Sequence, residues 1–146
     1  MQKVCIIIFN MKLFFAPKAF IVKDGKVLVV RESARHDTNA HAGEYSFVGG
    51  RIDDGEPWRD GFAREVKEEI GTEVQILRPL FISESFNKVQ GEDWHIVRCF
   101  FLCEMRSDEI VLSPEHDEYK WIDPANYKTE HCIENEYGAF EAFLKG

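Results

Sequence analysis

Three glutamates, Glu65, Glu68 and Glu69, are the residues of this chain whose type and spacing are best suited to chemistry. Positions i, i+3 and i+4 fall on one face of a helix that has about 3.6 residues per turn. Carboxylates held this close repel one another and resist ionising, so the patch favours a bound cation. Ligands that are all oxygen favour Mg²⁺ or Mn²⁺ over zinc or copper. The spacing therefore predicts a site for a divalent ion.

A solvated acidic helix face is the alternative explanation for the same three residues. Exposed helices commonly balance a glutamate with a basic residue at i+4, because such pairs stabilise the helix. Here Glu65 meets Glu69 at i+4, so the repulsion is not relieved within the helix. The pattern favours a binding function over a purely solvated face.

The segment 50–72 resembles the Nudix box, G-x5-E-x7-R-E-U-x-E-E-x-G-U, in which U is an aliphatic residue. One position departs from the pattern, because Thr72 stands where an aliphatic residue is usual. Its β-branched side chain is close to valine in size, so we expect a small effect. The residues that match at the required spacing are Gly50, Glu56, Arg64, Glu65, Val66, Glu68, Glu69 and Gly71.

The resemblance implies an α/β fold, the Nudix α/β/α sandwich with a mixed β-sheet. It also implies hydrolysis of the pyrophosphate bond in a nucleoside diphosphate linked to another group, with Mg²⁺, or Mn²⁺, as the cofactor. The family's metal ligands correspond to Glu65, Glu68, Glu69 and the backbone carbonyl of Gly49. Glu68 or Glu69 could also take a proton from the attacking water. Arg64 corresponds to an arginine that orients a glutamate, and we place it with the catalytic residues.

A fourth carboxylate often completes such a site from a loop across the sheet. Glu109, Glu115 and Glu118 are the candidates in this chain, and the sequence does not choose among them. Arg51, next to the box glycine, could contact phosphate or form a surface salt bridge. The five histidines show no ligand spacing, and we assign them no role.

The resemblance leaves two other functions open, because a fold does not fix a function. One is an isomerase or a hydrolase of non-nucleoside diphosphates. The other is a catalytically silent Nudix domain used for ligand sensing. Silent domains usually lose a box glutamate, whereas this chain keeps all of them, so we favour the pyrophosphohydrolase. The sequence does not identify the group attached to the nucleotide.

The composition is that of one ordinary globular domain over residues 1–146. The chain is 45% hydrophobic and 30% charged, and its formal net charge is −8. Nucleic-acid binders usually carry basic patches, so this charge argues against a nucleic acid as the main partner. A small nucleotide held through a metal ion remains compatible with it.

The four cysteines and the first residues bear on location and assembly. Cys5, Cys99, Cys103 and Cys132 lack zinc spacing, so we expect small buried thiols in a reducing, cytoplasmic compartment. Residues 1–16 are apolar, but Asn10 and Lys12 interrupt them, and cleavage after them would cut into the domain. We expect an extra strand or an arm at residues 4–9 or 13–15, a homodimer contact through residues 1–10, and no membrane span.

The expected elements alternate between strands and helices around the box. A helix is expected from Pro57 to Gly71, and a second helix in the last stretch, where Ile133, Tyr137, Phe140 and Leu144 recur at helical spacing. Within the first helix, an apolar stripe that includes Ala63 should pack on the sheet. Strands are expected at 19–22, 27–31, 44–48, 73–83 with a break at Pro79, 94–103 and 119–122. Polar loops are expected at 32–43, 84–93 and 107–118.

Overall fold

The computed structural model describes residues 10–34 and 41–146. Its seven-stranded sheet lies between two α-helices, α1 (Trp58–Ile70) and α2 (Tyr137–Lys145). Two short 3-10 turns, η1 (Pro124–Asn126) and η2 (Glu134–Glu136), precede α2. The strands are β1 (Met11–Lys23), β2 (Lys26–Glu32), β3 (Tyr45–Ser46), β4 (Val48–Gly49), β5 (Val74–Val89), β6 (Glu92–Met105) and β7 (His116–Ile122).

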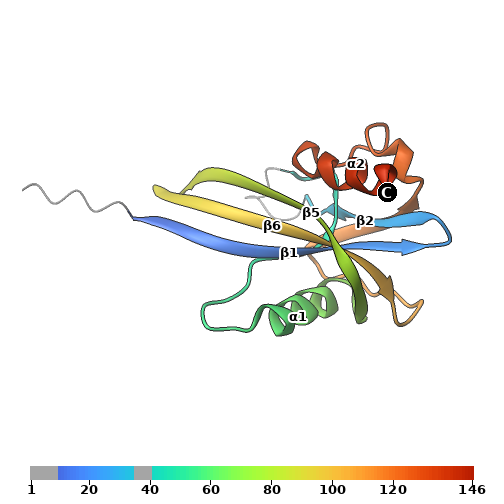
Figure 1. Cartoon of the computed structure of the whole chain (residues 1–146), viewed down its shortest axis with the longest axis horizontal. Coiled ribbons are helices and arrows are strands. Elements are labelled where there is room, and N and C mark those ends of the chain that lie inside the picture. Colours follow the sequence, from blue (N-terminus) through green and yellow to red (C-terminus); the bar gives the residue numbers. More distant parts are fainter. Residues whose placement is uncertain (1–9, 35–40) are drawn as a thin grey trace, which may run out of the picture.

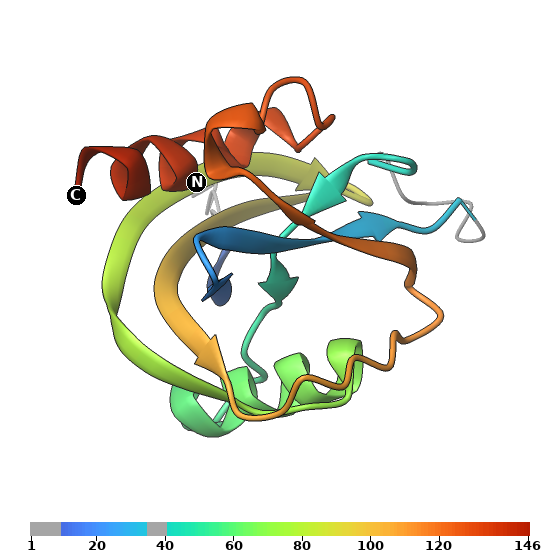
Figure 2. The same cartoon turned by 90° about the vertical axis from the view of Figure 1, so that its right-hand side faces the viewer.

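The sheet is mixed, as predicted. Its main order is β3-β2-β1-β6-β5, while β4 pairs with β1 and β7 with β2. Strands β1 and β6 run parallel, and the other pairs are antiparallel. The sheet curls, with α1 below it and α2 above it (Figures 1 and 2). The predicted α/β/α sandwich is therefore confirmed.

Strand β1 is longer than expected and connects the two halves of the sheet. The sequence predicted a strand near Lys18, but β1 begins at Met11 and pairs in parallel with β6 from Met11 to Ile21. Residues 13–15, predicted as a separate strand or arm, belong to this pairing. The segment 4–9, the other candidate, lies outside the described residues.

The predicted loop at 84–93 is wrong, because β5 and β6 form one long hairpin. Their pairing continues to Val89 opposite Glu92, and the chain turns at Gln90 and Gly91, both with positive φ. The hairpin projects from the body of the molecule, so polar side chains there stay in solvent while the backbone pairs (Figure 1). Pro79 causes a register shift and no break, since β5 lies at the sheet edge, where a missing N–H is tolerated.

Helix α1 ends where the sequence predicted. Gly71 adopts the left-handed conformation, with φ of 74°, and its N–H bonds to the carbonyl of Lys67. Phe62, Val66 and Ile70 are buried, but Ala63, which we placed in the same apolar stripe, is exposed. The packed stripe is therefore narrower than expected and leaves the rest of the helix free to face other groups.

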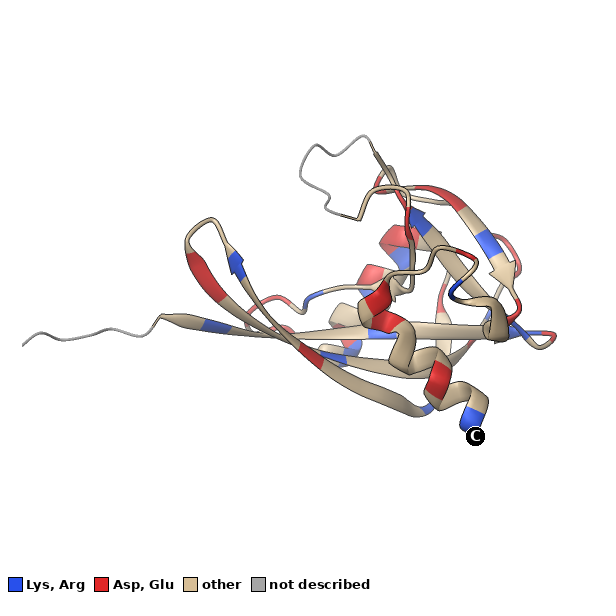
Figure 3. Ribbon diagram, turned by 90° about the horizontal axis from the view of Figure 1, so that it is seen from above, with Lys and Arg blue, Asp and Glu red and all other residues tan. Residues whose placement is uncertain are grey.

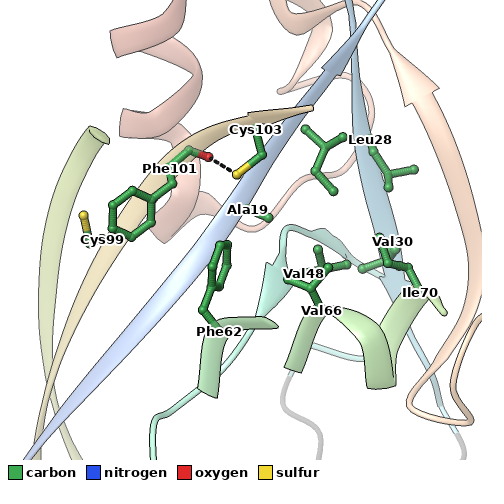
Figure 4. Packing of buried hydrophobic residues seen from close by; sticks show 11 residues of the cluster. Ala19, Leu28, Val30, Val48, Phe62, Val66, Ile70, Cys99, Phe101 and Cys103 are labelled. Atoms are coloured by element: carbon green, nitrogen blue, oxygen red, sulfur yellow. Dashed lines mark hydrogen bonds between the residues drawn. The ribbon is translucent and has the colours of Figure 1, made fainter. Parts of the chain in front are cut away.

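Two hydrophobic clusters hold the helices to opposite faces of the sheet. The cluster between α1 and the sheet joins Phe62, Val66 and Ile70 to β1, β2 and β6, and it contains the buried thiols of Cys99 and Cys103 (Figure 4). Figure 4 also shows the Cys103 thiol directed at the Phe101 carbonyl, 3.3 Å away. The cluster under α2 centres on Phe20, Phe47, Phe100 and Phe140. The segment 47–49 passes between these two cores.

The last helix starts later than expected. Ile133 is buried as predicted, but it precedes the 3-10 turn η2, and α2 itself begins at Tyr137. Phe140 packs inward, whereas Leu144 is 49% exposed. No helix in the described ranges is long and apolar enough to span a membrane.

Candidate active site

A pocket of about 410 Å³ lies beside β4, on the α1 side of the molecule. Glu65 and Glu69 enter it from α1, Glu115 enters from the segment before β7, and Gly49 and Gly50 form its wall. The sheet, the box helix and the chain before β7 thus bring three carboxylates to one cavity. The sequence predicted the first two and left the third among three candidates.

Glu69 is the most enclosed of these carboxylates. The residue is only 7% exposed, and its Oε2 accepts a hydrogen bond from the Gly49 backbone N–H at 2.6 Å. Gly49 has φ of 127°, and a Cβ there would collide with the Pro17 carbonyl of β1. A glycine is therefore needed for β4 to approach β1 and present its N–H to Glu69.

Burial dominates the charge state of Glu69. Removal from water raises the pKa of this carboxyl from 4.5 to about 7, although Lys18, the Gly49 N–H and His116 all act in the opposite direction. The group is thus poised between its neutral and ionised forms near neutral pH. A cation in the pocket would favour the ionised form.

Glu65 lies against the backbone of Gly50. A Cβ on Gly50 would come within 2.9 Å of Glu65 Oε2, so the glycine leaves the space that the carboxylate uses. Burial raises the pKa of Glu65, the Arg64 guanidinium lowers it, and the charges of Glu68 and Glu115 raise it further. These contributions place Glu65 and Glu115 in each other's electrostatic field.

Arg64 connects the loop before α1 to the acidic face of the helix. Its Nε and Nη2 donate to the two oxygens of Glu56, each at 2.9 Å. Its Nη1 donates to Glu65 at 3.1 Å and lies 3.3 Å from Glu68. Arg64 therefore contacts three box carboxylates at once, and its orienting role stays a prediction of the family resemblance. Glu68 is mostly exposed and, unlike Glu65, does not line the pocket.

The pocket offers oxygen donors, but they are not gathered around one point. Within residues 10–34 and 41–146, no three Asp, Glu, His or Cys side chains are already close enough to enclose an ion. Arg64 holds three of the box carboxylates instead, those of Glu56, Glu65 and Glu68. The donors are nevertheless of the kind that Mg²⁺ and Mn²⁺ accept, and the buried Glu69 lacks a cation beside its carboxylate at ion-pair distance in the described chain. The residues therefore fit a divalent ion.

Lys18 is a functional candidate that the sequence reasoning missed. Its ammonium donates to the carbonyl oxygens of Phe47 at 3.4 Å and Gly49 at 3.2 Å. The Gly49 carbonyl is the expected metal ligand, so Lys18 reaches the edge of the candidate site. The available signal was a lone cation in the otherwise apolar run at 13–22.

Arg51 lines the pocket, and its cation packs on two aromatic rings. Its guanidinium stacks 4.8 Å from the ring centre of Phe14 and 4.4 Å from that of Trp94. It makes no ion pair with a carboxylate in the part of the chain that the structure describes. The surface salt bridge, one of its two expected contacts, is absent there, while Arg51 lines the pocket.

The three candidates for a fourth carboxylate occupy different places. Glu115 lines the pocket, Glu109 is exposed on the preceding segment, and Glu118 pairs with Arg31 at 2.7 Å. Only Glu115 of the three reaches the box glutamates. Its neighbour His116 is buried, and its Nε2 lies 3.4 Å from Glu32. No spacing in the sequence pointed to that histidine.

The matching family model is the NUDIX domain, which covers residues 16–141. The chain belongs to the Nudix family. The CTP pyrophosphohydrolase of Escherichia coli K12 is 30% identical over 134 residues, covering 92% of this chain and 93% of that protein. The nucleoside triphosphatase NudI of Escherichia fergusonii is 24% identical over 71% of this chain and 77% of its own length.

Solved structures show the same fold. A MutT protein from Methanosarcina mazei Go1 superposes with a TM-score of 0.74 at 24% identity, covering 93% of this chain and 96% of that one. A MutT NUDIX hydrolase from Burkholderia pseudomallei gives a TM-score of 0.73 at 23% identity, covering 90% and 98%. These similarities confirm the fold, and the family model confirms the family resemblance that the box predicted.

Proposed function

We propose that this protein is a divalent-metal-dependent pyrophosphohydrolase that cleaves the P–O–P bond of a nucleoside diphosphate linked to another group. The observation that carries the proposal is the buried carboxylate of Glu69, bonded to the Gly49 N–H in one pocket with Glu65 and Glu115. A Nudix relative at 30% identity is named a CTP pyrophosphohydrolase, which supports a nucleotide substrate.

The proposed ligands for Mg²⁺ or Mn²⁺ are Glu65, Glu68, Glu69 and the Gly49 carbonyl. A divalent ion bound there would neutralise charge on the pyrophosphate oxygens and make nearby water more acidic. Arg64 holds Glu65 and Glu68 in position through one guanidinium. Glu68 is mostly exposed and shares the Arg64 guanidinium with Glu65, and it would complete the set from solvent.

The attacking water adds to one phosphorus, the bridging oxygen leaves with the other phosphate, and a carboxylate of the pocket takes the water's proton. Glu68 and Glu69 were the acceptors that the sequence suggested. We favour Glu115, because it lines the same pocket, makes no ion pair in residues 10–34 and 41–146, and is not among the proposed metal ligands. Arg51, which lines the same pocket, would balance phosphate charge.

The proposal also covers the domain organisation, the partners and the location of the protein. We propose one Nudix domain over residues 1–146, a small-molecule nucleotide substrate with no nucleic acid partner, and a cytoplasmic location. Cys99, Cys103 and Cys132 are buried free thiols, which suits a reducing compartment. Acidic and basic positions are interspersed along the described ribbon, with no long basic stripe (Figure 3).

The test is product formation from a panel of nucleoside triphosphates and nucleoside diphosphate derivatives, with and without Mg²⁺. We expect a nucleoside monophosphate and the complementary phosphate product only when Mg²⁺ or Mn²⁺ is present. EDTA should abolish turnover while the melting curve stays cooperative, and Mg²⁺ should raise the melting temperature, because it binds the folded state. Turnover that persists in metal-free protein would contradict the mechanism, and no turnover on any nucleotide would favour a silent domain.

A further inference from the structure

Arg51 is the one basic residue among the described residues that line the candidate active site. The carboxylates that line the same pocket are those of Asp53, Asp54, Glu65, Glu69 and Glu115. An exposed arginine beside several carboxylates would ordinarily pair with one of them. The Arg51 guanidinium nevertheless makes no ion pair and no hydrogen bond within residues 10–34 and 41–146. Its five N–H donors are therefore available to a ligand.

Two aromatic rings take the place of the missing ion pair. The centre of the Arg51 guanidinium lies 4.4 Å from the ring centre of Trp94 and 4.8 Å from that of Phe14. Both distances are within the range in which an aromatic face attracts a cation, about 6 Å. The two rings also contact each other, with their centres 4.7 Å apart and their planes at 60°. Unlike a carboxylate, such a cradle holds the cation without neutralising its charge.

The cradle is built by the parallel pairing of β1 and β6. Trp94 pairs with Lys12, and Phe14 lies two residues further along β1, so both rings project from the same face of the sheet. The indole Nε1 of Trp94 donates to Glu92 Oε2 at 3.1 Å, and the same carboxylate oxygen lies 2.9 Å from Lys12 Nζ. These contacts fix the orientation of the indole before any ligand binds.

The backbone beside Arg51 is also tied to β1, because the Ile52 N–H donates to the Phe15 carbonyl at 2.9 Å. We propose that Trp94, together with Phe14, is a positioning residue that holds the Arg51 guanidinium ready for a phosphate group of the substrate. This inference rests on the proposed function, because it takes the anion that Arg51 binds to be the substrate's diphosphate.

The cradle explains how an arginine in an acidic pocket stays available to a phosphate. Released from the rings, the long side chain could pair with Asp53 or Asp54 on the following residues, and either carboxylate would compete with the ligand. Held on the rings, Arg51 loses less conformational freedom when a phosphate binds, so less affinity is spent on ordering it. Substitution of Trp94 should therefore weaken diphosphate binding, and it should do so only while Arg51 is present.

The experiment measures binding of methylenediphosphonate by calorimetry at saturating Mg²⁺. A carbon replaces the bridging oxygen in this probe, so it binds without being cleaved. Arg51→Gln should weaken binding at least roughly tenfold, since a charge-assisted hydrogen bond is lost. Trp94→Leu should weaken it roughly fivefold, whereas Trp94→Phe, which keeps a ring under the cation, should stay within about twofold. In the Arg51→Gln background, Trp94→Leu should change the affinity by less than about twofold, because a residue that acts through Arg51 has no effect without it.

Two variants serve as matched controls and should bind the probe as the wild type does. Arg59 lies 4.6 Å from the ring centre of Trp58 but does not line the pocket, so Arg59→Gln removes a similar cation from a tryptophan. Phe86 is a 62% exposed ring on the same hairpin as Trp94, and Phe86→Leu removes it. Melting temperatures show whether each variant folds.

Three outcomes would overturn the inference: a wild type that does not bind methylenediphosphonate at millimolar concentration, undiminished affinity in folded Trp94→Leu, or an equal loss from Trp94→Leu with and without Arg51. The last result would mean that the two rings only pack against the arginine stem. Hydrolysis of the nucleotide panel by wild-type protein is measured in parallel. Coupled binding without hydrolysis of any nucleotide would contradict the proposed function alone, and hydrolysis without coupling would contradict the inference alone.

Discussion

The ammonium nitrogen of Lys18 lies 3.2 Å from the carbonyl oxygen of Gly49, the backbone group expected to bind a metal ion. The same carbonyl follows the N–H that holds Glu69 Oε2 at 2.6 Å. A fixed positive charge therefore sits at the edge of the proposed cation site. It supports the folded arrangement when no metal is bound, and it must oppose a second cation when one arrives.

Lys18→Met should consequently bind Mg²⁺ more tightly than the wild type. Loss of one nearby positive charge at a half-buried position is worth on the order of 1 kcal/mol, or roughly fivefold in affinity. Calorimetric titration with Mg²⁺ and Mn²⁺ measures it, with Lys26→Met, at the exposed start of β2, as the control. Unchanged or weaker affinity in Lys18→Met would show that the ammonium does not compete with the metal.

Glu69→Gln should lose activity by on the order of a hundredfold or more while the fold survives. An amide oxygen is a poor ligand for Mg²⁺, although it can still accept the Gly49 hydrogen bond. Glu68→Gln should also lose most activity if Glu68 completes the metal site. Steady-state kinetics at saturating Mg²⁺ test both variants, with the exposed Glu73→Gln as the control. Near-normal turnover in both would refute the proposed ligand set.

The buried carboxyl of Glu69 should also affect how the free energy of unfolding depends on pH. Burial raises the pKa of Glu69 from 4.5 to about 7, so between these values the folded state holds a proton that the unfolded state has released. The free energy of unfolding of metal-free protein should therefore fall as pH rises through this window, by on the order of 3 kcal/mol for this group. Urea titrations at pH 4.5 and 7.5 should show a smaller fall for Glu69→Gln. An equal fall in the variant and the wild type would contradict the assignment.

The local structure of the Nudix box could be predicted from the sequence because it depends on residues that are close together in the chain. Spacing alone put Glu65 and Glu69 on one helix face, and Gly71 supplied the left-handed residue that ends the helix. The burial of Glu69 and the projection of Glu115 into the same pocket depend on contacts between β4, α1 and the segment before β7. The spacing of residues in a sequence does not reveal contacts between distant elements. Glu115 could therefore be predicted only as one of three candidates for the fourth carboxylate.

The prediction of a loop at 84–93, where β5 and β6 form a hairpin, failed for a related reason. A strand whose two faces lie mostly in solvent can carry polar side chains, so residues such as Asn87 and Lys88 resembled a loop. These residues form a strand because their backbone is hydrogen-bonded to β6. The alternation of polar and apolar residues in the sequence does not reveal that pairing. The burial of Glu136 was likewise not predictable, because its sequence position two residues after the exposed Glu134 gives no sign that it is buried.

Glu115→Gln should separate proton transfer from metal binding. Glu115 lines the pocket with Glu65 and Glu69 but is itself exposed. We expect kcat to fall by roughly 100-fold, the usual range for losing a general base, while Mg²⁺ affinity changes by less than about threefold. Glu109→Gln and Glu118→Gln, outside the pocket, should retain activity. A full loss of metal binding in Glu115→Gln would make it a ligand, and unchanged kcat would exclude it as the base.

Deletion of residues 1–10 should leave the candidate active site intact and change self-association. The described part of β1 starts at Met11 and stays paired to β6, so the truncated chain keeps the strand that carries Lys18. Residues 4–9 read Val-Cys-Ile-Ile-Ile-Phe, and Met11 and Leu13 beside them are 55% and 68% exposed. The apolar composition of residues 4–9 and the exposed side chains of Met11 and Leu13 favour contact with a second subunit. Light scattering should show a dimer for the full chain and a smaller mass after truncation, with unchanged Mg²⁺-dependent melting. Equal masses and equal melting temperatures for the two chains would exclude this role.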